Sequence, residues 1–210
     1  MIIAILGPDG SGKTTIANML VDALSRECID ARHHAHRFGI LPPLGVFRLR
    51  RKKSTHDMGV KCSKDTLSYD LKENSALRAF VYVSWYGIDY LCGGILLRLQ
   101  NTFGNRRRAA IFARYFYDYY YQSNNRRLNN HVKRLVEIIV PRPDFIFFLD
   151  RDAQEIHDGK PELPVEEIKR QQQIIRERLG SYAEFYCVDA RSGPEHTAEQ
   201  ILHLLASSVS

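Results

Sequence analysis

Residues 7–14 read Gly-Pro-Asp-Gly-Ser-Gly-Lys-Thr, which has the spacing G-x-x-x-x-G-K-[S/T] of a phosphate-binding loop. The apolar residues 2–6 precede this segment and indicate a strand, and residues 15–25 follow it with the pattern of a helix. A strand, a glycine-rich loop and a helix in this order are typical of an α/β fold that binds a nucleoside triphosphate. The alternative is a glycine-rich turn that only begins a helix.

The residue types of this loop suit a bound polyphosphate. Glycines let the backbone wrap around an anion, so that N–H groups and the positive end of the next helix face the phosphates. Lys13 adds a mobile cation, and Thr14 offers a hydroxyl to Mg²⁺. The residues expected to bind the triphosphate are Gly7, Asp9, Gly10, Ser11, Gly12, Lys13, Thr14 and Thr15.

The chain has 210 residues, of which 44% are hydrophobic. Because this length and composition suit one α/β domain with a buried core, we expect residues 1–210 to form a single domain. The four cysteines are scattered, with no C-x-x-C pair, and no secretion signal precedes the first strand. Both observations favour a reducing, cytoplasmic location.

The longest apolar stretch is residues 79–97. Asp89 and three glycines interrupt it, and Arg78 and Arg98 flank it. We therefore expect a buried helix of the domain and no transmembrane segment.

The formal net charge is +6, and the basic residues cluster at 48–53, 106–108 and 126–127. These cations suit a triphosphate or an acidic small molecule as well as a nucleic acid, and no nucleic-acid-binding motif accompanies them. We expect no specific nucleic-acid partner. A solvated basic face is the alternative, and weak contact with an anionic membrane surface stays open.

Apolar runs and helix-length segments alternate along the chain, which predicts an α/β fold with a doubly wound parallel sheet flanked by helices. The expected strands are residues 2–6, 109–113, 145–149 and 185–188, with a weaker candidate at 30–36. The expected helices are residues 13–26, 74–101, 125–140, 165–180 and 195–207. Residues 39–73 show weak periodicity and many charges, so we expect a mobile excursion over the site there.

The sequence resembles the thymidylate kinase superfamily of P-loop nucleoside monophosphate kinases. It is most similar to the thymidylate-kinase-like proteins associated with bacterial surface-polysaccharide genes. The matching segments are the loop at 7–15, His36-Arg37 with Leu41-Pro42-Pro43-Leu44-Gly45, Arg114-Tyr115-Phe116-Tyr117-Asp118, Pro141-Arg142-Pro143-Asp144 leading to Leu149-Asp150, and Lys160-Pro161-Glu162-Leu163 followed by Arg170-Gln171.

This resemblance implies a P-loop kinase core that uses ATP and Mg²⁺. It also implies phosphoryl transfer to a nucleoside monophosphate such as dTMP, or to another small phosphorylated acceptor. A lid near residues 151–165 and a homodimer formed through helices beside the sheet are further implications. The long helix predicted at 74–101 is expected to form the interface of that dimer.

Phosphoryl transfer requires positioned cations around the moving group, which guides the assignment of roles. Catalytic roles are expected for Lys13, Arg114 and Lys160. The expected contacts to the acceptor are Asp9, Arg37, Arg78, Arg114 and Asp118, and the expected ligands of Mg²⁺ are Thr14 and Asp150. Alternatives remain open: a turn-stabilising Asp9, surface ion pairs for the arginines and a turn-capping Asp150.

Tyr82, Trp85, Tyr86 and Asp89 have the spacing of one helix face. Such a stripe is either core or a wall that stacks on the base or sugar of the acceptor, with Asp89 as its polar anchor.

Two positions depart from the family pattern. Ala113 stands where the family has an Asp before its Arg-Tyr pair, and Gly159 stands where the thymidylate-kinase-like pattern has an Arg before Lys-x-Glu. An arginine of the second kind contributes roughly 10³ to 10⁵ in rate in related phosphoryl transfers. Candidates to replace it are Lys160, Arg170, Arg176 and Arg178. The alternative function is therefore a nucleotide-binding regulatory or scaffold protein with degenerate catalytic residues.

Overall fold

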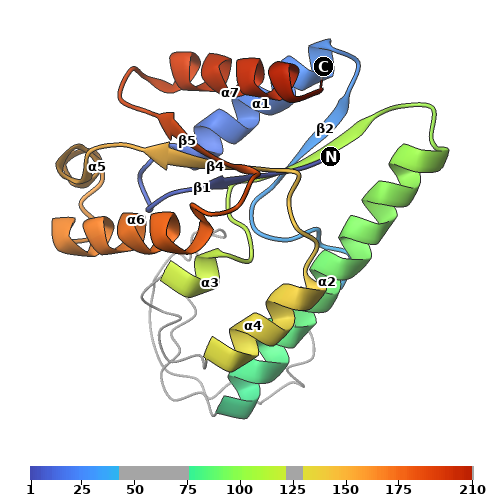
Figure 1. The fold of residues 1–210 in the computed structure, drawn as a ribbon, viewed down its shortest axis with the longest axis horizontal. Coiled ribbons are helices and arrows are strands. Elements are labelled where there is room, and N and C mark those ends of the chain that lie inside the picture. The colour runs from blue at the N-terminus through green and yellow to red at the C-terminus, as the bar shows by residue number, and fades with distance from the viewer. Residues whose placement is uncertain (43–75, 122–129, 210) are drawn as a thin grey trace, which may run out of the picture.

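Five parallel strands form one sheet in the computed structural model, which describes residues 1–42, 76–121 and 130–209 (Figure 1). The strand order is β2-β3-β1-β4-β5, and every neighbouring pair is parallel. The strands are β1 (Ile2–Leu6), β2 (Asp30–His34), β3 (Arg108–Phe112), β4 (Phe145–Asp150) and β5 (Phe185–Asp189). The doubly wound sheet predicted from the alternating pattern is confirmed, including the weak candidate at β2, which ends two residues earlier than expected.

Seven helices occur in the described residues. They are α1 (Lys13–Arg26), α2 (Ala76–Phe103), α3 (Asp118–Tyr121), α4 (Asn130–Ile139), α5 (Ala153–Gly159), α6 (Val165–Leu179) and α7 (Pro194–Val209). The predictions for α1, α2, α6 and α7 are confirmed to within two residues at each end. The prediction at 125–140 is confirmed for α4, and its first residues lie outside the described part. The short helices α3 and α5 were not predicted, because neither is long enough to show a helical period.

Helices cover both faces of the sheet, with α1 and α7 on one side and α2, α3, α4 and α6 on the other (Figure 1). Every residue of β1 is buried for this reason. Since successive side chains of a strand point to opposite faces, Ile3 and Ile5 join a core with residues of α1 and α7. Ile2 and Leu6 join a second core with residues of α2, α4 and α6.

The register of the sheet brings several segments to one edge. Leu6 pairs with Phe148, Ala4 pairs with Phe112, and His34 also pairs with Phe112. The chain segments that follow β1, β2, β3 and β4 therefore emerge side by side at the carboxyl edge. This is the edge at which open parallel sheets bind their ligands.

The helix α2 has 28 residues and is only half buried. Val83, Tyr86 and Tyr90 face the core, whereas Ile95 and Phe103 are exposed. The buried helix expected at 79–97 is therefore buried on one face, which packs against the sheet and α4 in the described part of the chain. Among the described helices, none combines the length and the apolarity that a membrane span requires.

Two predictions fall largely or wholly outside the described part of the chain. Of the excursion at 39–73, only residues 39–42 are described. Arg78 lies on α2, but its side chain is outside the description, as is that of Tyr82.

Candidate functional site

The phosphate-binding loop joins β1 to α1 at the carboxyl edge. Gly10 and Gly12 have φ angles of 94° and 89°, which side chains rarely tolerate. Gly12 is also the N-cap residue of α1, and the helix has no side-chain cap there and no acidic residue in its first turn. Backbone N–H groups and the positive end of the helix dipole consequently face the loop, which is the arrangement that binds phosphate.

Two features of the loop fit a bound anion. The hydroxyl oxygen of Ser11 is buried and has no hydrogen-bond partner among the described residues, so a donor there is left unused. Gly10 lies against α5, where an added Cβ would meet Lys160 Cβ at 3.2 Å and Ile156 Cγ2 at 3.3 Å. Because Gly10 has no side chain, the backbone of the loop lies directly against α5.

Lys13 is buried in this loop. Its Nζ atom donates to the carbonyl oxygens of Gly7 and Pro8, at 2.8 and 2.7 Å. Burial lowers the pKa of the Lys13 ammonium, and the nearby carboxylates of Asp9 and Asp118 oppose that shift. The ammonium is held at the mouth of the phosphate loop, where the motif places its cation.

Arg114 and Asp9 form an ion pair across the edge of the sheet. A guanidinium nitrogen of Arg114 donates to Asp9 Oδ1 at 2.7 Å, and Lys13 Nζ lies 3.5 Å from the same oxygen. Asp9 comes from the phosphate loop and Arg114 from the end of β3, 105 residues later. The sequence predicted both residues as acceptor contacts, and the fold brings them together.

Asp118 is the first residue of α3 and is buried. It accepts a hydrogen bond from the Tyr121 hydroxyl. Burial raises the pKa of the Asp118 carboxyl to about 6, although Lys13, Tyr121 and Arg114 act in the opposite direction. Asp9, Lys13, Arg114 and Asp118 thus form one electrostatically coupled cluster, which we call the loop cluster.

Arg37 follows β2 at the same edge of the sheet. Its Nη1 atom donates to the carbonyl oxygen of Leu41 at 2.8 Å, and its guanidinium lies 5.5 Å from the centre of the Tyr86 ring. The charges of Arg37 and Arg114 both reinforce the lowering of the His36 pKa that burial causes. Arg37 therefore lies on the same side of the molecule as the loop cluster.

Asp150 ends β4 and is bound by a cation. A guanidinium nitrogen of Arg176 donates to Asp150 Oδ1 at 2.5 Å. Thr14 is exposed on the first turn of α1. In the described residues, no group of three or more His, Cys, Asp or Glu side chains is placed to hold a metal ion. A cation at this edge would take few oxygens from the protein and the rest from phosphates and water, which is the usual coordination of Mg²⁺.

The four cations proposed to replace a lid arginine are already engaged. Lys160 is exposed and pairs with Glu162 at 3.1 Å. Arg170 donates to both carboxylate oxygens of Glu167 and to the Tyr121 carbonyl oxygen. Arg176 binds Asp150, and Arg178 lies over the ring of Tyr120 and 3.6 Å from Glu137. Ala113 is buried in the apolar core with α1, so its methyl group packs where the thymidylate-kinase-like sequence pattern led us to expect a carboxylate.

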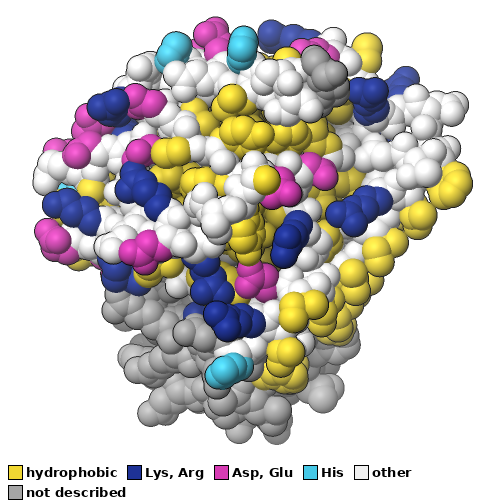
Figure 2. Space-filling model, viewed as in Figure 1, with side chains coloured by type: hydrophobic (Ala, Val, Ile, Leu, Met, Phe, Trp, Pro, Cys, Tyr) yellow, Lys and Arg dark blue, Asp and Glu magenta, His cyan; other side chains and the backbone are white. Residues whose placement is uncertain are grey.

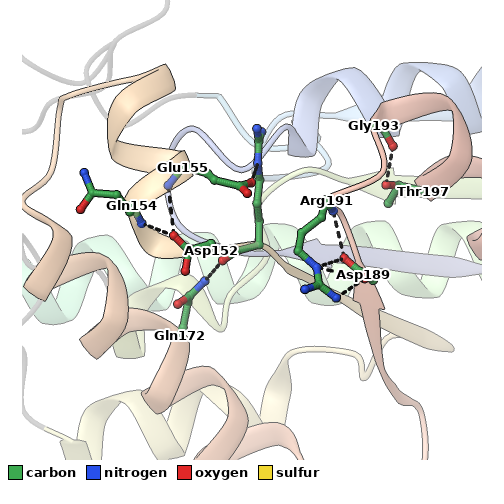
Figure 3. A network of polar contacts seen from close by, with 9 residues as sticks. Asp152, Gln154, Glu155, Gln172, Asp189, Arg191, Gly193 and Thr197 are labelled. Atoms are coloured by element: carbon green, nitrogen blue, oxygen red, sulfur yellow. Dashed lines mark hydrogen bonds and ion pairs between the residues drawn. The ribbon is translucent and has the colours of Figure 1, made fainter.

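Sequence reasoning missed a polar network beside the ends of β4 and β5 (Figure 3). Asp152 caps α5 by accepting from the N–H groups of Gln154 and Glu155. Arg191 donates to both carboxylate oxygens of Asp189. The spacing Asp152-x-x-Glu155 is that of a capping box, which could have revealed α5. No comparable signal marks the pair Asp189 and Arg191, because the last residue of a strand and a residue two positions later follow no fixed geometry.

The sheet order, the phosphate loop and the cluster at its mouth define the fold of an α/β P-loop kinase. A crystal structure of thymidylate kinase from Ehrlichia chaffeensis is similar over 98% of this chain and 98% of its own, with a TM-score of 0.60 and 14% sequence identity. No protein-family model and no curated protein sequence matches the chain. At this identity the similarity shows the fold, so the thymidylate kinase fold expected from the sequence is confirmed. The association with surface-polysaccharide genes receives no support.

Proposed function

We propose that the protein is an ATP- and Mg²⁺-dependent phosphotransferase that moves the γ-phosphate to a nucleoside monophosphate such as dTMP, or to another small phosphorylated acceptor. The convergence of Asp9, Lys13, Arg114 and Asp118 at the mouth of the phosphate loop carries this proposal. Two cations and two carboxylates at a helix N-terminus suit the binding of two anionic reactants whose charges must be brought together.

The loop residues 7–15 would hold the phosphates of ATP, with Lys13 as the cation and Ser11 as an added hydroxyl donor. Thr14 would bind Mg²⁺, and Asp150 would reach it through water once released from Arg176. Bound ATP supplies the phosphoryl group, and Mg²⁺ neutralises part of its charge. The buried hydroxyl of Ser11, which has no partner in the described part of the chain, and the start of α1, which lacks a side-chain cap, support this assignment.

Arg114 and Arg37 would hold the anionic group of the acceptor, because a guanidinium binds phosphate in a bidentate manner. Arg78 and Lys160 remain proposed as further contacts. Asp9 would orient a hydroxyl of the acceptor, and Asp118 would hold Lys13 and Arg114 in place by its charge.

The test measures ADP formation with ATP and Mg²⁺, alone and with a panel of nucleoside monophosphates and sugar phosphates. Acceptor-dependent ADP formation is expected, and Lys13→Ala should lower it at least about a hundredfold because the transferred group loses its cation. Lys169→Ala removes the same charge from an exposed position on α6 and should leave the rate unchanged. Equal rates for the wild type and Lys13→Ala would refute the assignment.

A second candidate function is a nucleotide-binding regulatory or scaffold module. The burial of Ala113 and the engagement of Arg170, Arg176 and Arg178 by acidic groups favour it. This candidate predicts ATP binding without transfer to any acceptor. An arginine at position 159 should then restore transfer, since an added Cβ at Gly159 meets nothing within 4 Å in the described structure. Gly159→Gln, which has a long side chain without charge, is the matched control.

Two further properties are part of the proposal. The three described cysteines, Cys28, Cys92 and Cys187, are exposed and free, which suits a reducing compartment such as the cytoplasm. A homodimer is proposed through α2, which exposes several large apolar side chains.

A further inference from the structure

Asp89 lies on α2 and is completely buried. Its two carboxylate oxygens accept from backbone N–H groups of the segment that follows β2. Oδ2 accepts from Gly39 at 3.0 Å, and Oδ1 accepts from Leu41 at 2.7 Å. Burying a carboxylate is costly unless hydrogen bonds compensate, so these two donors are what stabilise Asp89 in the interior.

Other residues of α2 bind the same segment, residues 36–42. The Tyr90 hydroxyl donates to the carbonyl oxygen of His36, and Trp85 Nε1 donates to that of Pro42 at 3.0 Å. The Phe38 ring packs against Tyr90 and Phe112. It also lies so close to Gly93 that any Cβ at position 93 would overlap with it. The helix α2 therefore holds this segment at its two ends and in its middle.

Arg37 is held by the same arrangement. Asp89 fixes the Leu41 N–H group, and the carbonyl oxygen of Leu41 in turn accepts from Arg37 Nη1. Tyr86, one turn before Asp89 on α2, lies under the guanidinium. Two hydrogen bonds, one on each side of the backbone of Leu41, thus connect the buried carboxylate to the arginine at the ligand edge.

We propose that Asp89 is a positioning residue for the phosphate acceptor, which acts by holding Arg37 in the orientation that binds the acceptor's anionic group. This inference rests on the proposed function, because it takes Arg37 as an acceptor contact. Asp89 itself touches no ligand, since it is fully buried beneath residues 39–41.

The test substitutes Asp89→Asn, which keeps the shape of the side chain but replaces one acceptor oxygen by an NH₂ group. One of the two backbone N–H groups then faces a donor, so residues 39–41 should detach. With the phosphate loop occupied by saturating ADP, calorimetric titration should show that dTMP and inorganic phosphate bind the variant at least about tenfold more weakly. ATP affinity, measured without an acceptor, should stay within about twofold, because the phosphate loop is untouched.

The double variant Asp89→Asn with Arg37→Ala gives the decisive readout. If Asp89 acts through Arg37, the double variant should bind dTMP as weakly as Arg37→Ala alone. If the two substitutions instead lower the dTMP affinity by the product of their separate effects, the proposal is overturned. Unchanged affinity of Asp89→Asn for dTMP and phosphate would also overturn it. Tyr90→Phe removes one hydroxyl from the same contact surface and should weaken acceptor binding in the same direction. If Asp89→Asn does not fold, the acceptor affinity of Tyr90→Phe tests the proposal in its place, and an unchanged affinity would overturn it.

Trp85 provides a reporter that does not depend on activity, since it is the single tryptophan of the chain and donates to Pro42. Its emission should shift in Asp89→Asn and remain unchanged in a matched control. Asp22→Asn makes the same chemical change at an exposed position of α1. An unchanged Trp85 emission in Asp89→Asn would contradict the proposed contact.

These measurements separate the two proposals. If phosphate binding depends on Asp89 and Arg37 but no ADP forms with any acceptor, the positioning role stands and the proposed transfer fails. If phosphate binds the wild type and Arg37→Ala equally, Arg37 is no anion ligand, and the positioning role fails whatever the ADP assay shows.

Discussion

Burial sets the electrostatics of individual residues in this site. Asp118 and Lys13 are both removed from water. Burial raises the pKa of Asp118 and lowers the pKa of Lys13, which favours the neutral form of each group. For Asp118 the result is a pKa of about 6, well above its ordinary value of 3.8. The carboxylate is retained although its ionisation costs stability, which suits a group whose charge acts on Lys13 and Arg114.

The pH dependence of stability should reveal Asp118. Because its folded pKa is raised, the folded state binds more protons than the unfolded state between about pH 4 and 6, and stability is lost as the pH rises through that range. Asp118→Asn removes this loss. Urea unfolding should show the free energy of the variant rising by about 2 kcal/mol relative to the wild type between pH 4 and pH 7. The exposed control Asp22→Asn should show no such trend, and a constant difference for Asp118→Asn would refute the shifted pKa.

Among the elements, the helix α1 ends in a strained backbone conformation. The helix α1 ends in a Schellman motif, in which the Ile29 N–H group donates to the Leu24 carbonyl oxygen and the Cys28 N–H group donates to that of Ser25. Cys28 occupies the left-handed position of this motif, with a φ of 62°, where glycine is usual. A side chain there is strained, so the C-terminus of α1 carries a local cost.

Cys28→Gly should therefore stabilise the protein. Relief of the left-handed strain contributes about 1–2 kcal/mol, and the greater freedom of glycine in the unfolded chain offsets part of it, which leaves a gain of about 0.5–1 kcal/mol. Urea denaturation of the two proteins measures the gain. Cys28→Ser keeps the Cβ atom and should give no increase, and a loss of stability in Cys28→Gly would show that the strain is relieved in another way.

At the scale of the whole molecule, apolar side chains remain uncovered along one side. They gather over α2 at the right of the view in Figure 2. The exposed large apolar residues of α2 and α4 are Phe80, Val81, Ile88, Ile95, Leu96, Leu99, Phe103, Leu135, Ile138 and Ile139. Because α4 packs beside α2, these residues belong to two neighbouring helices. Contiguous apolar patches of this kind are uncommon on monomers.

The proposed homodimer would cover this face, since an isologous contact lets the same long helix pack against its copy. Sedimentation equilibrium should give twice the mass of the chain at micromolar concentration. The double variant Ile95→Glu with Leu99→Glu should sediment as a monomer with an unchanged circular dichroism spectrum, because buried like charges would face each other across the contact. The double variant Asn18→Glu with His203→Glu adds two carboxylates at exposed positions of α1 and α7, across the sheet from α2, and should stay dimeric. A monomeric wild type would refute the dimer.

Much of the fold was predictable because its signals are local. The loop at 7–14 carries its own geometry, and the apolar runs of β1, β3 and β4 are continuous because helices bury both faces of the sheet. Hence the sheet, the four longer predicted helices and the phosphate loop followed from sequence alone. The short helices α3 and α5 did not, because they depend on caps and on neighbours.

The sequence by itself determined which residue types could bind a triphosphate and the order of the elements that present them. Only the tertiary structure decided which of these residues meet. The pairing of Asp9 with Arg114, the capture of Asp150 by Arg176 and the bonds from Asp89 to residues 39 and 41 all join segments far apart in the chain. Such contacts depend on strand order and helix packing, which leave no local pattern in the sequence.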